Sequence, residues 1–174
     1  CDWSSDVCSS DLTVLEIGCG WGGFAEQAAG QGLQVRGLTL SREQLAYASD
    51  RIRRAGLEHQ VQFELRDYRD ESRHHQGIAS IEMFEAVGER YWPAYFKTIS
   101  RTLAKGGRAV IQTIAIADAL FERYRRGTDF IQQYVFPGGM LPSDAAFRAQ
   151  AERAGLRVVS SFAFGQDYAR TLEL

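Results

Sequence analysis

One stretch constrains the fold of this chain more than any other: Val-Leu-Glu-Ile-Gly-Cys-Gly-Trp-Gly-Gly at residues 14–23. It begins as an apolar strand, ends in glycines and is followed by a helical pattern. Gly18 and Gly20 allow the backbone to pass close to a ligand, because a Cβ at either position would collide with it. In an open α/β sheet such a loop lies beyond the carboxyl ends of the strands, where ligands bind.

Strand-like runs alternate with helical patterns along the chain. Strands are expected at residues 13–18, 34–39, 61–65, 78–83, 107–114 and 156–162. This alternation predicts an α/β fold, with a mostly parallel sheet covered by helices on both faces.

The helix boundaries also carry local signals. Ser41 and Gln44 have the spacing of a capping box, and Gly56 follows the apolar positions of that helix. Pro93 suits the first turn of a second helix, which is expected to end at Gly106-Gly107.

Composition excludes several classes of protein. The 174 residues are 45% hydrophobic and 24% charged, and ten Phe, seven Tyr and three Trp can build the core of one globular domain. The net charge of -2 argues against a strongly basic nucleic-acid binder. No apolar run approaches the length that a transmembrane helix requires.

The first twelve residues differ from the rest. Ser-Ser-Asp-Val at 4–7 is nearly repeated at 9–12, without the basic and apolar regions of a signal peptide. With three cysteines in the chain, two of them in this stretch, neither a disulfide framework nor a metal site is expected. We expect a non-native or disordered leader over 1–12 and one domain over 13–174.

A long insert over 115–142 interrupts the alternation before a helix near Ser143. It contains three arginines (Arg123, Arg125 and Arg126) followed by an apolar, aromatic run at 130–136. Inserts of this length in α/β proteins are often functional lids. The arginines fit either a contact with anionic lipid headgroups or an ordinary solvated helix face.

The glycine loop admits more than one ligand. Gly18, Gly20 and Gly23 match the dinucleotide fingerprint, but no acidic residue stands around residues 38–41 to hold a ribose. Glu16 stands two residues before the first glycine, as an acid commonly does in S-adenosylmethionine-dependent methyltransferases. A nicotinamide site and a tight turn without any ligand remain as alternatives.

Six segments in order resemble the cyclopropane-fatty-acyl-phospholipid synthase family, which includes the mycolic acid cyclopropane synthases. They are VLEIGCGWGGFA (14–25), GLTLSREQ (37–44), DYRD (67–70), SIEMFEAVGERYW (80–92), FIQQYVFPGGMLPS (130–143) and FGQDYARTLEL (164–174). The resemblance implies a three-layer, Rossmann-like class I methyltransferase fold with S-adenosyl-L-methionine as methyl donor. It also implies a domain that is incomplete at both ends.

The same resemblance implies cofactor-binding residues in three loops. By position these are Glu16, Gly18, Cys19, Gly20 and Gly22 around the methionine and ribose, Thr39, Ser41 and Gln44 after the second strand, and Asp67, Tyr68 and Arg69 beside the adenine. Asp67 is suited to accept the adenine amino hydrogen and Tyr68 to pack on the ring. Without the resemblance, Asp67 fits a solvated loop equally well.

Active-site positions are implied in the same way. Glu85, Ile114 and Tyr168 match the family's bicarbonate network, and Gln112 stands where many members have histidine. Glutamine cannot titrate, so this site loses a possible positive charge. Without the resemblance, a helix-cap role explains Glu82 and Glu85 about as well as an active-site role does. His74 and His75 are expected in a solvated loop.

The implied reaction is methyl transfer to the cis double bond of an unsaturated phospholipid acyl chain, which gives a cyclopropane fatty acid. Such chemistry requires a dry apolar tunnel, and the 115–142 insert is expected to supply it. The protein is then expected in the cytoplasm, peripheral at the inner membrane face. The alternatives are a methyl-branched product, another small-molecule methyltransferase, a nicotinamide oxidoreductase and an inactive fragment.

Overall fold

The computed structural model describes residues 12–127, 133–134 and 138–171. The expected leader lies outside the described residues except for Leu12, and so does most of the 130–136 run. The expectation of a foreign or disordered leader therefore stays a prediction.

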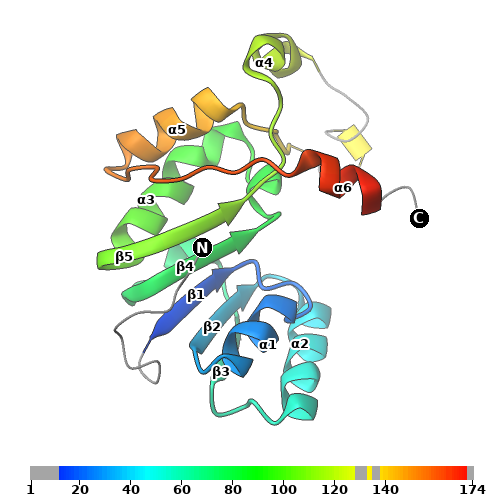
Figure 1. Ribbon diagram of the computed structural model, residues 1–174, viewed down its shortest axis with the longest axis vertical. Helices are drawn as coiled ribbons and strands as arrows, with labels where there is room; N and C mark the ends of the chain where they lie inside the picture. Colours follow the sequence, from blue (N-terminus) through cyan, green and yellow to red (C-terminus); the bar gives the residue numbers. More distant parts are fainter. Residues whose placement is uncertain (1–11, 128–132, 135–137, 172–174) are drawn as a thin grey trace.

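Five parallel strands form one sheet in the order β3-β2-β1-β4-β5. Their bounds are β1 Thr13–Ile17, β2 Gln34–Thr39, β3 Val61–Leu65, β4 His75–Ile81 and β5 Leu103–Gln112. The predicted parallel α/β sheet is confirmed, with the last two strands beginning several residues before the expected positions. All five carboxyl ends meet at one edge because the strands run in the same direction (Figure 1).

The sixth expected strand, at 156–162, is wrong. This segment forms no strand, and Val159 and Phe162 are 70% and 80% exposed. Apolar alternation favours an extended chain, but a strand exists only where a neighbouring strand takes up its backbone hydrogen bonds. Among the described residues, β5 pairs with β4 alone.

Helices cover both faces of the sheet, as predicted (Figure 1). Their bounds are α1 Gly23–Gly30, α2 Arg42–Ala55, α3 Trp92–Thr102, α4 Asp118–Arg126, α5 Asp144–Arg153 and α6 Gly165–Thr171. Val35 packs with residues of α1 and α2, whereas Leu15, Ile17 and Ile78 pack with those of α3 and α5. Side chains alternate along a strand, so these two clusters lie on opposite faces.

The larger cluster is built around Phe84, which follows β4. Its ring lies 4.9–5.4 Å from the rings of Trp92, Tyr95, Phe96 and Phe147. This packing fixes the segment after β4 against α3 and α5.

Local capping confirms most of the expected helix boundaries. The Ser41 hydroxyl accepts a hydrogen bond from the Gln44 backbone at 3.2 Å, and Gly56 ends α2 in a left-handed conformation. The expected end of α3 at Gly106-Gly107 is wrong, because α3 ends at Thr102 and both glycines belong to β5.

His75 also differs from its expected place in a solvated loop. It is the first residue of β4 and is 3% exposed, whereas His74 is exposed. Burial lowers the pKa of His75, so the ring is held neutral.

Candidate functional site

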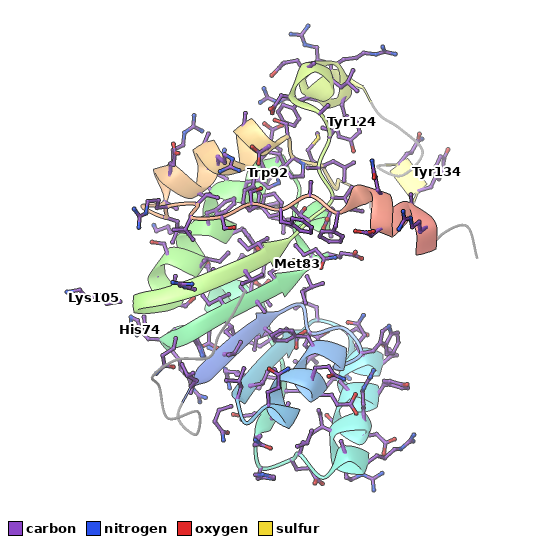
Figure 2. All side chains as sticks on the ribbon, viewed as in Figure 1. His74, Met83, Trp92, Lys105, Tyr124 and Tyr134 are labelled. Carbon is purple, nitrogen blue, oxygen red and sulfur yellow. The ribbon has the colours of Figure 1, made fainter. Side chains whose placement is uncertain are left out.

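The loops after β1, β2, β3 and β4 enclose a cavity of about 630 Å³ at the carboxyl edge of the sheet. Figure 2 shows Met83 at this edge, with His74 and Lys105 at the opposite edge. Seven of the predicted cofactor residues line the cavity: Gly18, Thr39, Ser41, Gln44, Asp67, Tyr68 and Arg69. The structure thus brings together three segments that are separate in the sequence.

The glycine loop turns away from β1 through backbone contacts with β2. The amides of Gly18 and Cys19 both donate to the Leu38 carbonyl, at 3.0 and 2.9 Å. A Cβ at Gly18 would lie 2.7 Å from Met83 Cγ, whereas a Cβ at Gly20 would meet nothing within 4 Å. Gly20 therefore borders open space, which suits the close approach of a ligand. Gly22 lies further along, as the N-cap of α1.

Glu16 ends up buried behind this loop, at 3% exposure. Its Oε2 has no hydrogen-bond partner among the described residues, and burial raises the pKa of the carboxyl to about 8. The group is therefore largely protonated at neutral pH, and a cation nearby would favour its ionised form.

Cys19 is packed away from the cavity at 3% exposure. A Cβ added to Gly37 would lie 2.9 Å from its Cβ, which places the side chain against β2. Burial raises the pKa of the thiol to about 12, so it is no nucleophile at neutral pH. Contact with a ligand in the cavity is left to its backbone.

The segment after β2 is ordered by side chains. The Thr39 hydroxyl donates to Gln44 Oε1 at 2.9 Å and accepts from the Ser41 backbone at 3.1 Å. The Gln44 side chain therefore completes the predicted capping box through the Thr39 hydroxyl and does not contact the Ser41 backbone amide directly. Leu40 between them is 73% exposed and lines the cavity.

The third wall follows β3. Asp67 accepts from the Arg69 backbone at 2.9 Å and from its guanidinium at 2.9 and 2.6 Å. These bonds hold the pKa of Asp67 below its usual value, so it is an ionised acceptor at neutral pH. The ring of Tyr68 packs edge-on against Tyr95, with centroids 5.7 Å apart.

Glu85 is positioned by the end of β5. Its Oε1 accepts hydrogen bonds from the Thr113 hydroxyl at 2.9 Å and from the Ile114 amide. Its Oε2 has no partner among the described residues, and the side chain is almost fully buried. The predicted association of Glu85 with Ile114 is thus present in the fold.

Gln112 points to a different carboxylate. Its side-chain amide donates to Glu82 Oε1 at 3.0 Å, and its backbone carbonyl accepts from the Glu82 backbone amide at 3.0 Å. Glu82 has φ of 48°, the one left-handed non-glycine residue in the described chain. A strained residue at the carboxyl end of a strand is typical of functional sites.

The fourth predicted active-site residue, Tyr168, has its side chain outside the described part of the structure. Its helix, α6, lies on the side toward which the strands point (Figure 1).

The insert is attached to the same region. Ile116 donates to the Pro142 carbonyl at 2.9 Å, and Met140 donates to the Glu85 carbonyl at 2.9 Å. The ring of Phe121 in α4 stacks on Trp92 at 6.2 Å. The predicted arginine cluster is divided: Arg125 binds Glu89 at 2.8 Å, whereas the Arg126 side chain is 81% exposed.

Several residues that line the cavity or bind Glu85 were not among the site residues predicted from the sequence. These are Leu40, Arg66, Met83, Tyr91 and Thr113. Thr113 lies between two predicted residues, and Met83 is the last residue of an expected strand. Their positions, though not their residue types, could therefore have indicated the site. In the described ranges no helix is long and apolar enough to cross a membrane, and no acidic, His or Cys cluster could hold a metal ion.

Comparison with known proteins places these features in a family. Residues 9–174 match the family described as mycolic acid cyclopropane synthetase. The chain is 41% identical to tuberculostearic acid methyltransferase UfaA1 of Mycobacterium tuberculosis, over 92% of this chain and 38% of that protein. It is 35% identical to cyclopropane-fatty-acyl-phospholipid synthase of Escherichia coli K12, over 92% of this chain and 40% of that protein.

Solved structures agree. The cyclopropane synthase MmaA2 from Mycobacterium tuberculosis superposes with a TM-score of 0.82 at 25% identity, over 93% of this chain and 60% of that one. Mycolic acid cyclopropane synthase CmaA1, complexed with SAH and CTAB, gives 0.79 at 26% identity, with the same coverage of both chains. The chain thus spans less than half the length of these two curated relatives.

Proposed function

This chain belongs to the mycolic acid cyclopropane synthetase family, and on that premise we propose that it transfers a methyl group from S-adenosylmethionine to the double bond of an unsaturated fatty acyl chain. The observation that carries the proposal is the cavity formed by Gly18, Thr39 and Asp67 after three neighbouring strands. A solved relative of this fold is complexed with SAH, the demethylated form of that donor.

The chain's residues suit this donor. Gly20 borders open space for a close backbone approach, Asp67 offers an ionised acceptor, and buried Glu16 offers a carboxyl that a cationic ligand would ionise. When bound, S-adenosylmethionine supplies an electrophilic methyl group on a sulfonium. Within the proposed site, the protein orients the donor and excludes water from it.

The product that we propose first is methylene- or methyl-branched. The sequence resemblance predicted a cyclopropane product, but the similarity to a tuberculostearic acid methyltransferase supports the branched alternative better. The routes to a methylene branch and to a cyclopropane both add a methyl group and lose one proton, so each product gains one CH₂. A saturated methyl branch additionally requires two electrons and two protons, supplied as a hydride from a separate reductant and a proton from solvent.

The residues around Glu85 fit bicarbonate poorly. The Thr113 hydroxyl and the Ile114 amide already donate to Glu85, and the Gln112 amide donates to Glu82. An anion there would lie against the Glu85 carboxylate, and the three donors named above are already directed to carboxylates. We therefore derive no step through bicarbonate and propose that Glu85 itself accepts the proton through Oε2.

The reaction is tested with the full-length protein, S-adenosylmethionine and a phospholipid carrying one cis double bond. Mass spectrometry should show a gain of one CH₂ in the acyl chain. Ozonolysis then separates a methylene branch, which ozone cleaves, from a cyclopropane, which ozone leaves intact. A saturated methyl branch also resists ozone, but its mass is greater than that of the cyclopropane by two hydrogens. A chain that binds NADPH and not S-adenosylhomocysteine would contradict the proposal.

Glu85 is tested by Glu85→Gln, which removes the charge and keeps the shape. We expect turnover to fall at least about a hundredfold, as for the loss of a general base, with unchanged binding of S-adenosylhomocysteine. Removal of bicarbonate from the assay should leave the wild-type rate unchanged. A rate that depends on added bicarbonate would indicate that bicarbonate, and not Glu85, accepts the proton.

Membrane contact is proposed from the insert. Arg123 and Arg126 of α4 are exposed, with Arg126 3.7 Å from Glu122 on the same helix. Leu120 of α4 is 49% exposed. Cationic and apolar side chains together suit an anionic lipid surface. Sedimentation with vesicles that contain phosphatidylglycerol tests this contact, and equal binding to neutral vesicles would contradict the role of the arginines.

A further inference from the structure

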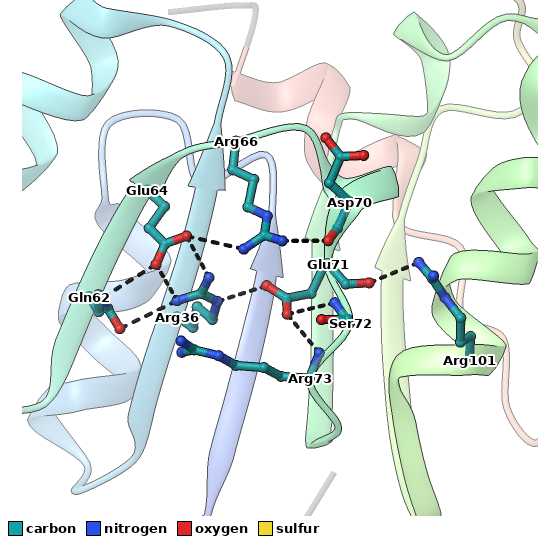
Figure 3. A network of polar contacts seen from close by, with 9 residues as sticks. All are labelled: Arg36, Gln62, Glu64, Arg66, Asp70, Glu71, Ser72, Arg73 and Arg101. Carbon is teal, nitrogen blue, oxygen red and sulfur yellow. Dashed lines mark hydrogen bonds and ion pairs between the residues drawn. The ribbon is translucent and has the colours of Figure 1, made fainter.

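The middle of β2 holds a buried ion pair that the proposed chemistry does not use. Arg36 is 6% exposed and donates from Nε to Glu71 Oε2 at 2.7 Å (Figure 3). Its two terminal nitrogens donate to the two carboxylate oxygens of Glu64, at 2.6 and 2.5 Å. Buried charges are a poor means of gaining stability, so another role for the pair is indicated.

Glu71 connects this pair to the backbone of the segment after β3. It is fully buried, and its Oε1 accepts the amides of Ser72 and Arg73 at 2.9 and 2.8 Å. One carboxylate therefore closes the turn on one side and binds β2 on the other.

Two further guanidinium groups hold the same segment through its carbonyls. Arg101 of α3 donates from Nη2 to the carbonyls of Arg69 and Glu71, at 3.0 and 2.8 Å. Arg66 donates to the Asp70 carbonyl at 2.6 Å. Figure 3 shows residues of the segment 66–73 between Arg36 of β2 and Arg101 of α3.

The segment held in this way is the cavity wall that carries Asp67, Tyr68 and Arg69. The cavity lining does not include Arg36, Glu71 or Arg101. We propose that Arg101, together with the Arg36–Glu71 pair, is a positioning residue that sets the place of this wall and thereby the affinity for the adenosine end of the methyl donor. The inference rests on the proposed function, which supplies the ligand.

Arg101 is the residue on which to test this frame, because it is exposed and its loss leaves no charge buried. Lys97 is an exposed cation on the same helix and provides the matched control. Arg101→Gln and Lys97→Gln remove one positive charge each. Only the first removes the two bonds to the segment 66–73.

Calorimetry on the full-length protein then measures binding of S-adenosylhomocysteine and of 5′-methylthioadenosine, which share the adenosine end. We expect Arg101→Gln to weaken both about tenfold and Lys97→Gln to weaken neither. KM for S-adenosylmethionine should rise by the same factor while kcat at saturation is unchanged. Arg101→Lys should recover part of the affinity, because an ammonium can still donate to both carbonyls.

Wild-type affinity in Arg101→Gln would overturn the inference. So would a lower kcat at unchanged KM, or the same loss in Lys97→Gln. A wild-type protein that binds neither ligand would instead refute the proposed function itself, so the two failures are distinguishable.

Discussion

The Thr113 hydroxyl donates to the Glu85 carboxylate at 2.9 Å, across 28 residues of sequence. This bond joins the end of β5 to the turn after β4 and leaves the opposite, buried oxygen of Glu85 without a described partner. It makes Thr113 a positioning residue for the proton acceptor that we propose.

Thr113→Val keeps the shape of the side chain and removes this donor. We expect kcat to fall about tenfold, because a hydrogen bond to a charged group contributes roughly 1.5 kcal/mol or more. Steady-state kinetics with the unsaturated phospholipid measures the change. Thr113→Ser retains the hydroxyl and should keep most of the activity; equal losses in both variants would contradict the argument.

Glu16 should make stability depend on pH. Burial raises its pKa from 4.5 to about 8, so the folded protein keeps a proton that the unfolded chain releases above about pH 4.5. The free energy of unfolding should therefore fall as pH rises from about 4.5 to about 8, by on the order of 4 kcal/mol. Urea titrations across this range should show the fall in wild type and a flatter profile in Glu16→Gln.

The same carboxyl should release a proton when a cationic ligand binds. S-adenosylmethionine carries an ammonium and a sulfonium, and a cation near Glu16 favours the ionised form. Calorimetry at neutral pH in buffers of different ionisation enthalpy measures the release, expected to approach one proton per ligand. Glu16→Gln is the control, and the same release from that variant would assign the proton to another group.

Gly20→Ala should impair binding more than folding. A Cβ there meets no protein atom within 4 Å, and the positive φ of 51° costs about 1 kcal/mol. We expect S-adenosylhomocysteine affinity to fall about tenfold or more, because the added methyl group would occupy the open space beside the loop into which we propose that the donor fits. Gly106, within β5, also has a positive φ, of 82°, and nothing within 4 Å of an added Cβ, so Gly106→Ala is the control and should bind normally.

Gln112→His tests whether this position influences the product. The substitution alters the bond from Gln112 to Glu82 and introduces a group that can carry a positive charge. We expect a larger fraction of ozone-resistant cyclopropane product than in wild type, measured by ozonolysis and mass spectrometry. Gln112→Asn retains an amide and should keep the wild-type ratio. Identical ratios in all three proteins would remove Gln112 from the determinants of the product.

Much of the fold could be predicted because its signals are local. The alternation of strands and helices, the Ser41 cap and the Gly56 end of α2 depend on residues a few positions apart. The parallel arrangement follows from that alternation, and it places the ends of β1, β2 and β3 at one edge. Seven residues that the family resemblance assigned to the cofactor line one cavity at this edge.

Other features depend on partners distant in the sequence. The segment 156–162 has the pattern of a strand, but no described strand accepts its hydrogen bonds. His75 follows a polar stretch and yet is buried at the start of β4. A propensity reports what a segment can form alone, and only its neighbours decide whether it pairs or is buried.

By itself the sequence determined the class of sheet, the glycine loop and the side chains available to the site. Only the tertiary structure decided that Thr113 and Ile114 bind Glu85, that Gln112 binds Glu82, and that Arg101 holds the cavity wall. The physical reason is that strand register and helix packing set which distant groups lie within about 3 Å, the range of a hydrogen bond.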